Sequence, residues 1–179
     1  MTVKKIRVGR TADSVTAVNA ILEKMVRYTR ILETKRFVQH GRTSVFSHSV
    51  SVAYFSLRIA RFFRLRIDET SLIRGALFHD YFLYDWHNKT GRSRMHGFVH
   101  PEIALANARK TDCLNAIETD IIRNHMFPLT SKFPRTKEGF LVSCADKICS
   151  VIETCNLTGL LFSYAHVAAD RAVPPYFFR

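Results

Sequence analysis

Glycine and proline are scarce in this chain, at 7 and 5 of 179 residues, and the sequence contains no internal repeat and no low-complexity segment. Regular alternation of apolar and polar residues, the pattern of half-buried strands, is hard to find, whereas helical spacing of apolar residues recurs along most of the length. These features argue against a β-rich fold. We predict an all-α fold and, because the length suits one core rather than two, a single domain over residues 1–179.

Long apolar runs are absent as well. No run approaches the roughly 20 residues that a membrane-spanning helix requires, and residues 1–10 are basic and polar rather than an export signal. We therefore expect a soluble, cytoplasmic protein without a membrane partner. The four cysteines show no C-x-x-C spacing, which favours reduced thiols in the core over disulfides.

Acidic residues are outnumbered by basic ones, 15 to 27, which gives a formal net charge of +12. An excess of this size attracts anions, which include phosphate-bearing substrates, nucleic acid and acidic surfaces. Charge alone does not choose among them. No helix-turn-helix or RNA-binding signature is found, so a nucleic-acid partner is not favoured.

Two segments in the first half of the chain carry metal-ligand types on an apolar helical face. In residues 44–65, apolar side chains at steps of three and four place His48 on the inward stripe. In residues 68–80, the same spacing leads to the adjacent pair His79 and Asp80 at the carboxyl end of a helix. All three side chains are therefore predicted to face the interior.

Two segments in the second half repeat the pattern. Apolar residues in the segment 111–125 lead by helical steps to His125, and a helix over 137–154 carries Asp146 on its apolar side. A bare imidazole or carboxylate in a core is costly unless something satisfies it. Several such groups that converge from different helices most economically share a metal ion, so the sequence predicts a metal site.

The remaining segments have less regular patterns. We expect a first helix over 13–37, a loop over 39–43, and a long polar and aromatic loop over 81–96 that covers the site. Pro101 is expected in the first turn of a helix that ends near Ala108, with His100 at its entrance.

The C-terminal tail, which ends in Pro174-Pro175 and three aromatic residues, is apolar. We expect it to dock on the domain or on a partner.

The order of these ligands resembles that of the HD superfamily of metal-dependent phosphohydrolases over residues 40–155. His48 lies in "FSHSVSVA", His79 and Asp80 in "RGALFHDYF", and Asp146 in "VSCADKI". The resemblance implies a helical bundle of the HD-domain type. It also implies that these four side chains bind one divalent metal ion and that the carboxylate of the pair can bridge to a second.

Two further segments are similar to HD members that hold two metal ions. They are "HPEIALANA", which begins at His100, and "IIRNH", which ends at His125, and the resemblance implies that both histidines bind the second ion. Cyclic-dinucleotide phosphodiesterases of the superfamily carry Ile-Gly-Lys where this chain has Tyr81-Phe82-Leu83, so that activity is not expected. The chain looks most like small uncharacterised bacterial HD-domain proteins.

The resemblance implies hydrolysis of phosphoesters by a metal-activated water, with nucleotides or related small phosphorylated molecules as substrates. Mixed imidazole and carboxylate ligands suit iron, manganese, cobalt or zinc, and magnesium is less expected. Asp80 and His96 are the candidate catalytic residues, His96 as the proton donor to the leaving group. Arg42, Arg94 and Lys147 are candidates for binding the phosphate.

Several aromatic residues leave two interpretations open. Tyr81, Tyr84 and Trp86 are suited either to stacking a nucleobase or to packing in the core. His40 and His87 lie in predicted loops, where a solvated or substrate-facing role is expected rather than coordination.

Two other functions are compatible with the same residues. One is a di-iron oxygenase, because related helical proteins use a pair of metal ions for oxidation. The other is a non-catalytic module in which a metal ion stabilises the fold and the basic surface binds nucleic acid. The sequence does not give the substrate, the metal or the oligomeric state.

Overall fold

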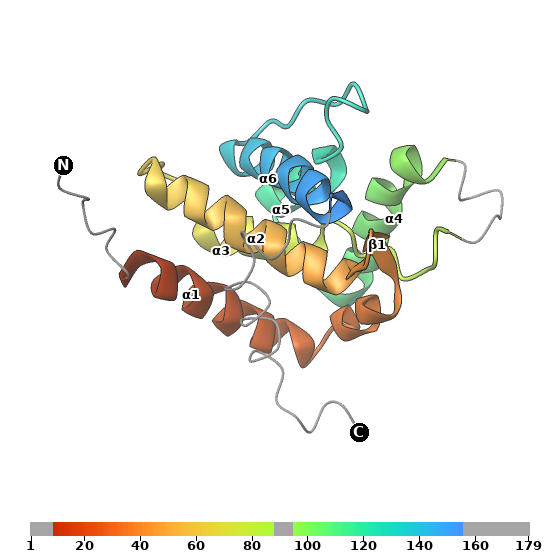
Figure 1. Cartoon of the computed structure of the whole chain (residues 1–179), viewed down its shortest axis with the longest axis horizontal. Coiled ribbons are helices and arrows are strands. Elements are labelled where there is room, and N and C mark those ends of the chain that lie inside the picture. Colours follow the sequence, from red (N-terminus) through yellow and green to blue (C-terminus); the bar gives the residue numbers. More distant parts are fainter. Residues whose placement is uncertain (1–8, 88–94, 156–179) are drawn as a thin grey trace.

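The computed structural model describes residues 9–87 and 95–155, and most of these residues are helical (Figure 1). The elements are α1 Gly9–Val26, the 3₁₀-helix η1 Ile31–Arg36, β1 Val38–His40, β2 Thr43–Ser44, α2 Val45–Phe62, α3 Glu69–Phe78, α4 His96–Thr111, α5 Ala116–Asn124 and α6 Lys137–Thr154. The predicted helical character is confirmed, and the helix predicted over 137–154 has the predicted bounds.

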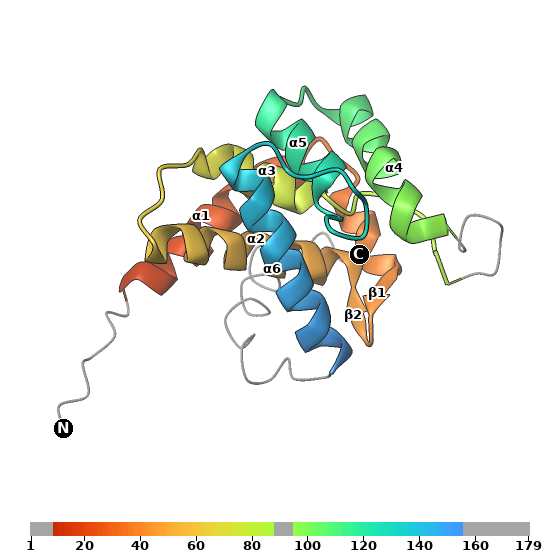
Figure 2. The same cartoon turned by 90° about the horizontal axis from the view of Figure 1, so that it is seen from above.

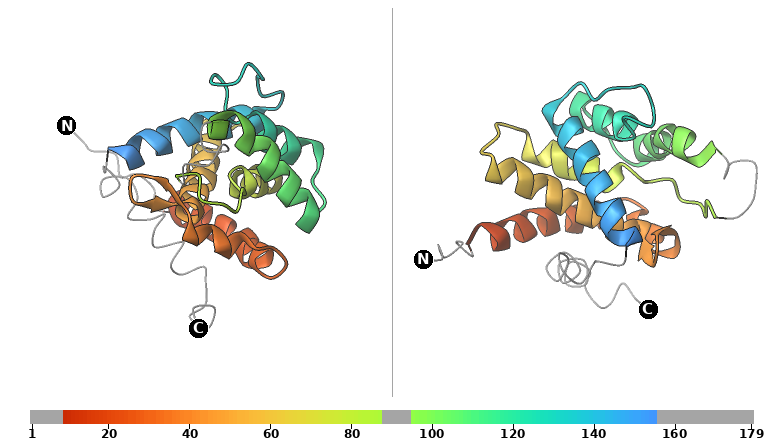
Figure 3. Two further views of the ribbon diagram at one scale, coloured as in Figure 1. Left: turned by 90° about the vertical axis from the view of Figure 1, so that its right-hand side faces the viewer. Right: turned by 45° about the horizontal axis from the view of Figure 1, so that its top comes forward.

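Helix α2 lies at the centre of the described part of the chain. It packs between α1 and α6 and runs beside α3 (Figure 1). Helix α6 crosses over α2 and also contacts α5, and α4 packs against α5 (Figures 2 and 3). Helices α2 to α6 thus surround a common interior, and α1 packs on α2 and α3 and contributes to the same core.

The apolar core joins all six α-helices in the described residues. Its fully buried members include Leu22, Leu57, Leu72, Ala108, Ile121 and Val142. Burial of a large aliphatic side chain of this kind stabilises the fold by about 1.5–3 kcal/mol. The core therefore holds fixed the helices on which the predicted metal ligands lie.

Helices α3 and α5 approach each other closely at Gly75. A Cβ atom at this position would lie 2.5 Å from Cδ1 of Ile121 and 3.0 Å from its Cβ. His79 follows Gly75 by one helical turn, and His125 follows Ile121 by one turn. The close approach therefore brings these two histidines together, and their ring centroids are 4.9 Å apart.

The first helix is shorter than predicted. Helix α1 ends at Val26 rather than near residue 37, and η1 and β1 follow it. The hydroxyl of Thr29 donates to the Met25 carbonyl at 2.8 Å, and the backbone N–H of Arg30 donates to the Tyr81 hydroxyl at 2.8 Å. Helical spacing continued beyond Val26, but these contacts to the end of α1 and to a distant part of the chain redirect the backbone.

The segment predicted as a loop over 39–43 is part of a small antiparallel hairpin, β1–β2, with Gly41 at a positive φ of 56° in its turn. Gln39 and Thr43 are buried. Glycine adopts this backbone conformation without steric cost. The strands are too short for a sequence pattern of period two, so the all-α prediction missed them.

The boundaries of α4 and α5 also differ from prediction. Helix α4 begins at His96, so Pro101 lies in its second turn and His100 lies inside the helix rather than at its entrance. Helix α5 begins at Ala116, after Asn115, whose side chain accepts from the backbone N–H of Glu118 in a capping box. Capping fixes the start of α5, which the apolar spacing placed at residue 111.

Two other predictions concern loops. In the segment 81–96, residues 81–87 lie outside helices and strands, as predicted, and Trp86 lines the pocket at the site, but Tyr81 and Phe82 are buried in the core. Residues 88–94 lie outside the described residues. The predicted C-terminal tail also lies outside them.

Of the four free cysteines, Cys149 is buried and Cys144 is half-buried, whereas Cys113 and Cys155 are exposed, so the prediction of core thiols is wrong for the last two.

Candidate metal centre

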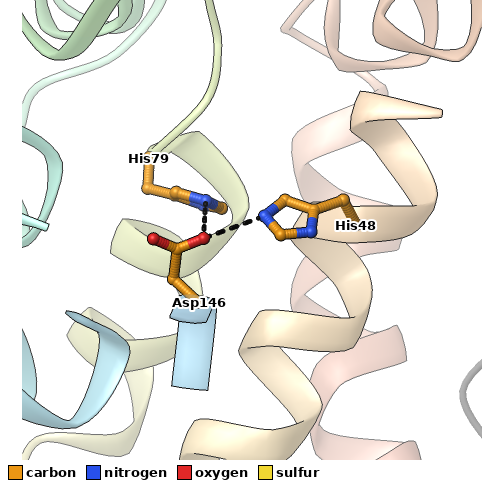
Figure 4. Close-up of side chains that lie close together, drawn as sticks. All are labelled: His48, His79 and Asp146. Carbon is orange, nitrogen blue, oxygen red and sulfur yellow. Dashed lines mark hydrogen bonds and ion pairs between the residues drawn. The ribbon is translucent and has the colours of Figure 1, made fainter. Parts of the chain in front are cut away.

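The structure brings together the side chains that the sequence placed on separate helices. His48 comes from the first turns of α2, Asp146 from the middle of α6, and His79 and Asp80 directly follow α3. Two groups of buried residues have ligand atoms that all lie within 4.8 Å of one another. The first is His48, His79 and Asp146 (Figure 4), and the second is His79, Asp80 and His125.

The distances within this cluster suit ligands of a common metal ion. His48 Nε2 lies 3.1 Å from Asp146 Oδ1, and His79 Nε2 lies 3.8 Å from the same oxygen (Figure 4). His79 Nε2 is 3.3 Å from Asp80 Oδ2. Ligands bound at about 2.0–2.2 Å to one ion are separated by roughly 3–3.5 Å. The residues present therefore could hold a metal ion without large rearrangement.

The carboxylate of Asp80 faces two pairs of histidines. Its Oδ2 lies 3.7 Å from Nε2 of His48 and 3.3 Å from Nε2 of His79. Its Oδ1 lies 3.1 Å from Nε2 of His100 and 3.6 Å from Nε2 of His125. One oxygen thus points to each pair, which is the placement that a bridging carboxylate requires.

The Nδ1 atom of each of the four histidines has a hydrogen-bond acceptor. His79, His100 and His125 donate from Nδ1 to backbone carbonyls at 2.7–2.8 Å. His48 donates from Nδ1 to Glu153 Oε2 at 2.8 Å. A proton on Nδ1 leaves the lone pair of a neutral imidazole on Nε2, and this is the arrangement found in metal-bound histidines. All four Nε2 atoms face the cluster.

The cluster has too few donors for its acceptors. Nε2 of His79 and Oδ1 of Asp80 are buried without a hydrogen-bond partner. Nε2 of His100 lies 2.9 Å from Nε2 of His125. Two lone pairs at this distance repel unless a cation lies beside them. The arrangement therefore favours a positive ion or a proton at the centre of the cluster.

The electrostatics of the metal-free cluster agree with this description. Burial lowers the pKa of His48, but its hydrogen bonds to Asp146 and Glu153 outweigh burial and raise this pKa to about 10. Burial raises the pKa of Asp146, but the imidazoles of His48 and His79 hold it well below its usual range. In the absence of metal, His48 is therefore protonated between two carboxylates, where its second proton takes the place of a metal ion.

Two other groups of the cluster, His125 and Asp80, have lowered pKa values. Burial, together with the neighbouring imidazoles of His79 and His100, lowers the pKa of His125 to about 3. Burial raises the pKa of Asp80, but the neighbouring imidazoles of His79 and His100 hold it well below its usual range. At neutral pH the imidazole of His125 is therefore neutral and the carboxylate of Asp80 is anionic.

Two side chains that were not predicted, those of Glu153 and Gln39, hold candidate ligands in place. Oε2 of Glu153 accepts the hydrogen bond from Nδ1 of His48. The other carboxylate oxygen, Oε1, is buried without a partner. Gln39 donates from Nε2 to Asp80 Oδ2 at 2.5 Å. Glu153 follows Asp146 by two helical turns on the same buried side of α6, and this spacing was visible in the sequence. Gln39 had no comparable signal because a hairpin positions it.

Lys147 lies beside the cluster, but its ammonium group is already engaged. It donates to the His125 carbonyl, to Asp146 Oδ2 at 3.2 Å and to Ser143 Oγ at 3.3 Å. The three acceptors match the three N–H donors of a lysine. Among the predicted phosphate ligands, Arg42 is exposed in the hairpin turn and does not line the pocket described below, and Arg94 lies outside the described residues.

His96, the predicted proton donor, is buried at the start of α4. Its Nδ1 lies 2.9 Å from the Tyr84 hydroxyl, and its ring stacks between those of Trp86 and His100. Burial lowers the pKa of His96 to about 4. At neutral pH the imidazole of His96 is therefore neutral and carries one N–H, which is a weak acid. His96 is better suited to a positioning role than to the predicted role of proton donor to the leaving group.

The aromatic residues pack rather than present open faces. Tyr81 is buried in the core. The ring of Trp86 stacks on that of His96 at an interplanar angle of 9°, and its centroid lies 4.0 Å from that of His87. The interpretation in which these rings stack a nucleobase is therefore not favoured. His40 is half-buried, 5.5 Å from His48 between ring centroids, and His87 is exposed.

A pocket of about 650 Å³ opens onto the cluster. Asp80, His100, His125 and Asp146 are among its lining residues. The volume is within the range of small-molecule sites, about 300–1,000 Å³. The candidate metal ligands are therefore accessible to a small substrate.

No helix in the described ranges combines the length and the apolarity needed to cross a membrane. In comparisons with known proteins, no family model, no curated protein and no solved structure matches this chain.

Proposed function

We propose that this chain is a metal-dependent phosphohydrolase of the HD type, with two divalent ions in the cluster. His48, His79 and Asp146 would hold the first ion, His100 and His125 would hold the second, and Asp80, whose two oxygens face the two groups of histidines, would contribute to both. The observation that supports the proposal is the convergence of four Nε2 atoms and two carboxylates, in which His79 Nε2 and Asp80 Oδ1 have no hydrogen-bond partner and the Nε2 atoms of His100 and His125 lie 2.9 Å apart. Such a set of buried acceptors is stabilised by cations.

When bound, the ions supply Lewis acidity, which polarises the phosphate and lowers the pKa of a water molecule. The side chains of the protein orient the reactants. Lys147 holds Asp146 and the His125 carbonyl in place, and Glu153 fixes the ring of His48. In the reaction, the oxygen of water bonds to phosphorus, the ester P–O bond breaks, and a proton from water passes to the leaving alcohol.

The proposal is tested by phosphate release from a panel of phosphoesters with manganese, iron, cobalt, zinc or magnesium. Asp80→Asn keeps the shape of the bridging side chain but removes its charge, and we expect activity to fall at least about a hundredfold. Asp85→Asn, an exposed acid in the same loop, is the control with the same change in net charge and retains wild-type activity. Equal activity of the wild type and Asp80→Asn would refute the proposal.

The same preparations separate this function from the oxygenase alternative. Iron-loaded protein that consumes oxygen but releases no phosphate would assign the centre to oxidation. Phosphate release without oxygen consumption supports hydrolysis.

A further inference from the structure

The pocket above the cluster has two chemically different parts. Its polar lining includes four of the candidate ligands, Asp80, His100, His125 and Asp146, together with Gln39, His40 and Ser150. Its apolar lining, here called the wall, consists of Met126, Pro128 and Leu129, from the loop between α5 and α6, together with Gly97 of α4. A Cβ at Gly97 would lie 3.0 Å from Cδ2 of Leu129, so the first turn of α4 closes against this wall. The wall is aliphatic and offers no side-chain hydrogen bond.

Leu129 is 53% exposed although it lies at a pocket that opens onto buried polar groups. An exposed aliphatic side chain at the mouth of a polar site gains by contact with an apolar group of a ligand, at about 25 cal/mol per Å² removed from water. The ring of Trp86, which also lines the pocket, already packs against the rings of His87 and His96. The wall therefore suits an apolar group that does not need to stack on an aromatic face.

The charge at the pocket suits one phosphate group. Lys147 is the one Lys or Arg among the described residues that line it, and its donors are engaged by protein acceptors. Two divalent ions bring about four positive charges, of which Asp80 and Asp146 neutralise about half. A phosphate monoester carries about −1.5 to −2 at neutral pH, which matches the remainder. A polyphosphate would need further cations.

We propose that the substrate is a phosphate monoester with a single phosphate, which binds at the cluster, and an apolar organic group, which packs on Met126, Pro128 and Leu129. This inference rests on the proposed function, because the ions of the centre receive the phosphate. According to this inference, Leu129 contributes to the choice of substrate. Leu129 lies in the loop between α5 and α6, which contains no candidate metal ligand other than His125.

The test is the binding of two non-hydrolysable phosphonates to the manganese-loaded full chain, measured by calorimetry. Phenylphosphonate and methylphosphonate carry the same phosphonate group and differ in apolar area. We expect phenylphosphonate to bind about tenfold more tightly or better. Leu129→Ser should reduce this preference at least about threefold.

The matched control is Phe98→Ser. Phe98 is also 53% exposed, lies on α4 next to Gly97, and does not line the pocket. This variant should keep the wild-type preference for phenylphosphonate. Because both substituted side chains are largely exposed, both variants are expected to fold.

Equal binding of the two phosphonates, binding of neither, or an equal effect of the two substitutions would overturn the inference. Phenyl phosphate as a substrate then separates the two proposals. A preference for phenylphosphonate without hydrolysis of phenyl phosphate under any metal would leave the apolar pocket supported and refute the proposed hydrolysis. Faster hydrolysis of a nucleoside triphosphate than of phenyl phosphate would support hydrolysis and overturn the single-phosphate inference.

Discussion

His100 and His125 direct their Nε2 atoms at each other across 2.9 Å while their Nδ1 atoms donate to the carbonyls of His96 and Ile122. The backbone thus fixes both rings in the orientation of ligands. A protein interior rarely leaves two acceptors in contact, because each loses its hydrogen bond to water. A cation beside the two Nε2 atoms, as in the proposed metal centre, would remove the repulsion between them.

Glu153 should control the affinity of the metal through His48. Glu153→Gln removes the negative charge next to Nδ1 while keeping the shape of the side chain, and we expect affinity for Mn²⁺ or Zn²⁺ to fall about tenfold or more. Glu138→Gln is the control, because Glu138 is a buried glutamate of the same helix that accepts from the backbone of Asp68 instead. A metal titration of the two variants checks this, and equal affinities would exclude the role of Glu153.

A variant of Lys147 distinguishes two roles of this residue, direct binding of phosphate and support of the candidate metal ligands. Because its three donors are engaged with His125, Ser143 and Asp146, we expect Lys147→Gln to lower metal affinity severalfold. If Lys147 instead binds phosphate directly, as the sequence suggested, the variant would raise KM with metal affinity unchanged. Steady-state kinetics at saturating metal, together with a metal titration, decide between these results.

Gly75 should be required for the approach of α3 and α5. Gly75→Ala gains helix propensity of about 1 kcal/mol but forces Ile121 to move, so we expect a net loss of about 1–3 kcal/mol in the free energy of unfolding. Ile121→Val removes the methyl group nearest to the new Cβ. Urea unfolding should show that the double variant is more stable than the sum of the two single effects, and simple additivity would contradict the contact.

The stability of the metal-free protein should be greatest near pH 6.5. The folded-state pKa of His48 is raised to about 10, so its contribution is complete below its unfolded value of about 6.5 and is lost as the pH rises toward 10. The pKa of His125 is lowered to about 3, so its neutral form contributes above about 6.5, and this contribution is lost as the pH falls toward 3.

Thermal unfolding after chelation, between pH 4 and pH 10, tests this prediction. His48→Gln should flatten the alkaline side only. An unfolding temperature in the wild type that is constant from about pH 6.5 to 10 would contradict the paired state of His48.

The sequence was sufficient for the ligands that lie on regular helices. His48 and Asp146 occupy apolar stripes whose period directly predicts their direction, and α6 has the predicted bounds. The predicted convergence of the four ligand-bearing segments was also found, because each ligand faces the core and the core is shared.

Other features depend on contacts between distant segments, which no local pattern encodes. The end of α1 is fixed by the bond between Arg30 and Tyr81, which are 51 residues apart. Gln39 reaches Asp80 from a hairpin too short to be recognised from periodicity. The stacking of Trp86 on His96 depends on the start of α4, which the sequence placed a turn too late.

The most direct test of the central claim is the metal content of the purified full chain after reconstitution with Mn²⁺, Fe²⁺, Co²⁺ or Zn²⁺ and removal of free metal. We expect two ions per chain in the wild type and in Asp85→Asn, a lower content in His125→Gln and His79→Gln, and a higher unfolding temperature with metal than without it. A wild-type chain that retains none of these ions, and whose unfolding temperature none of them changes, would contradict it.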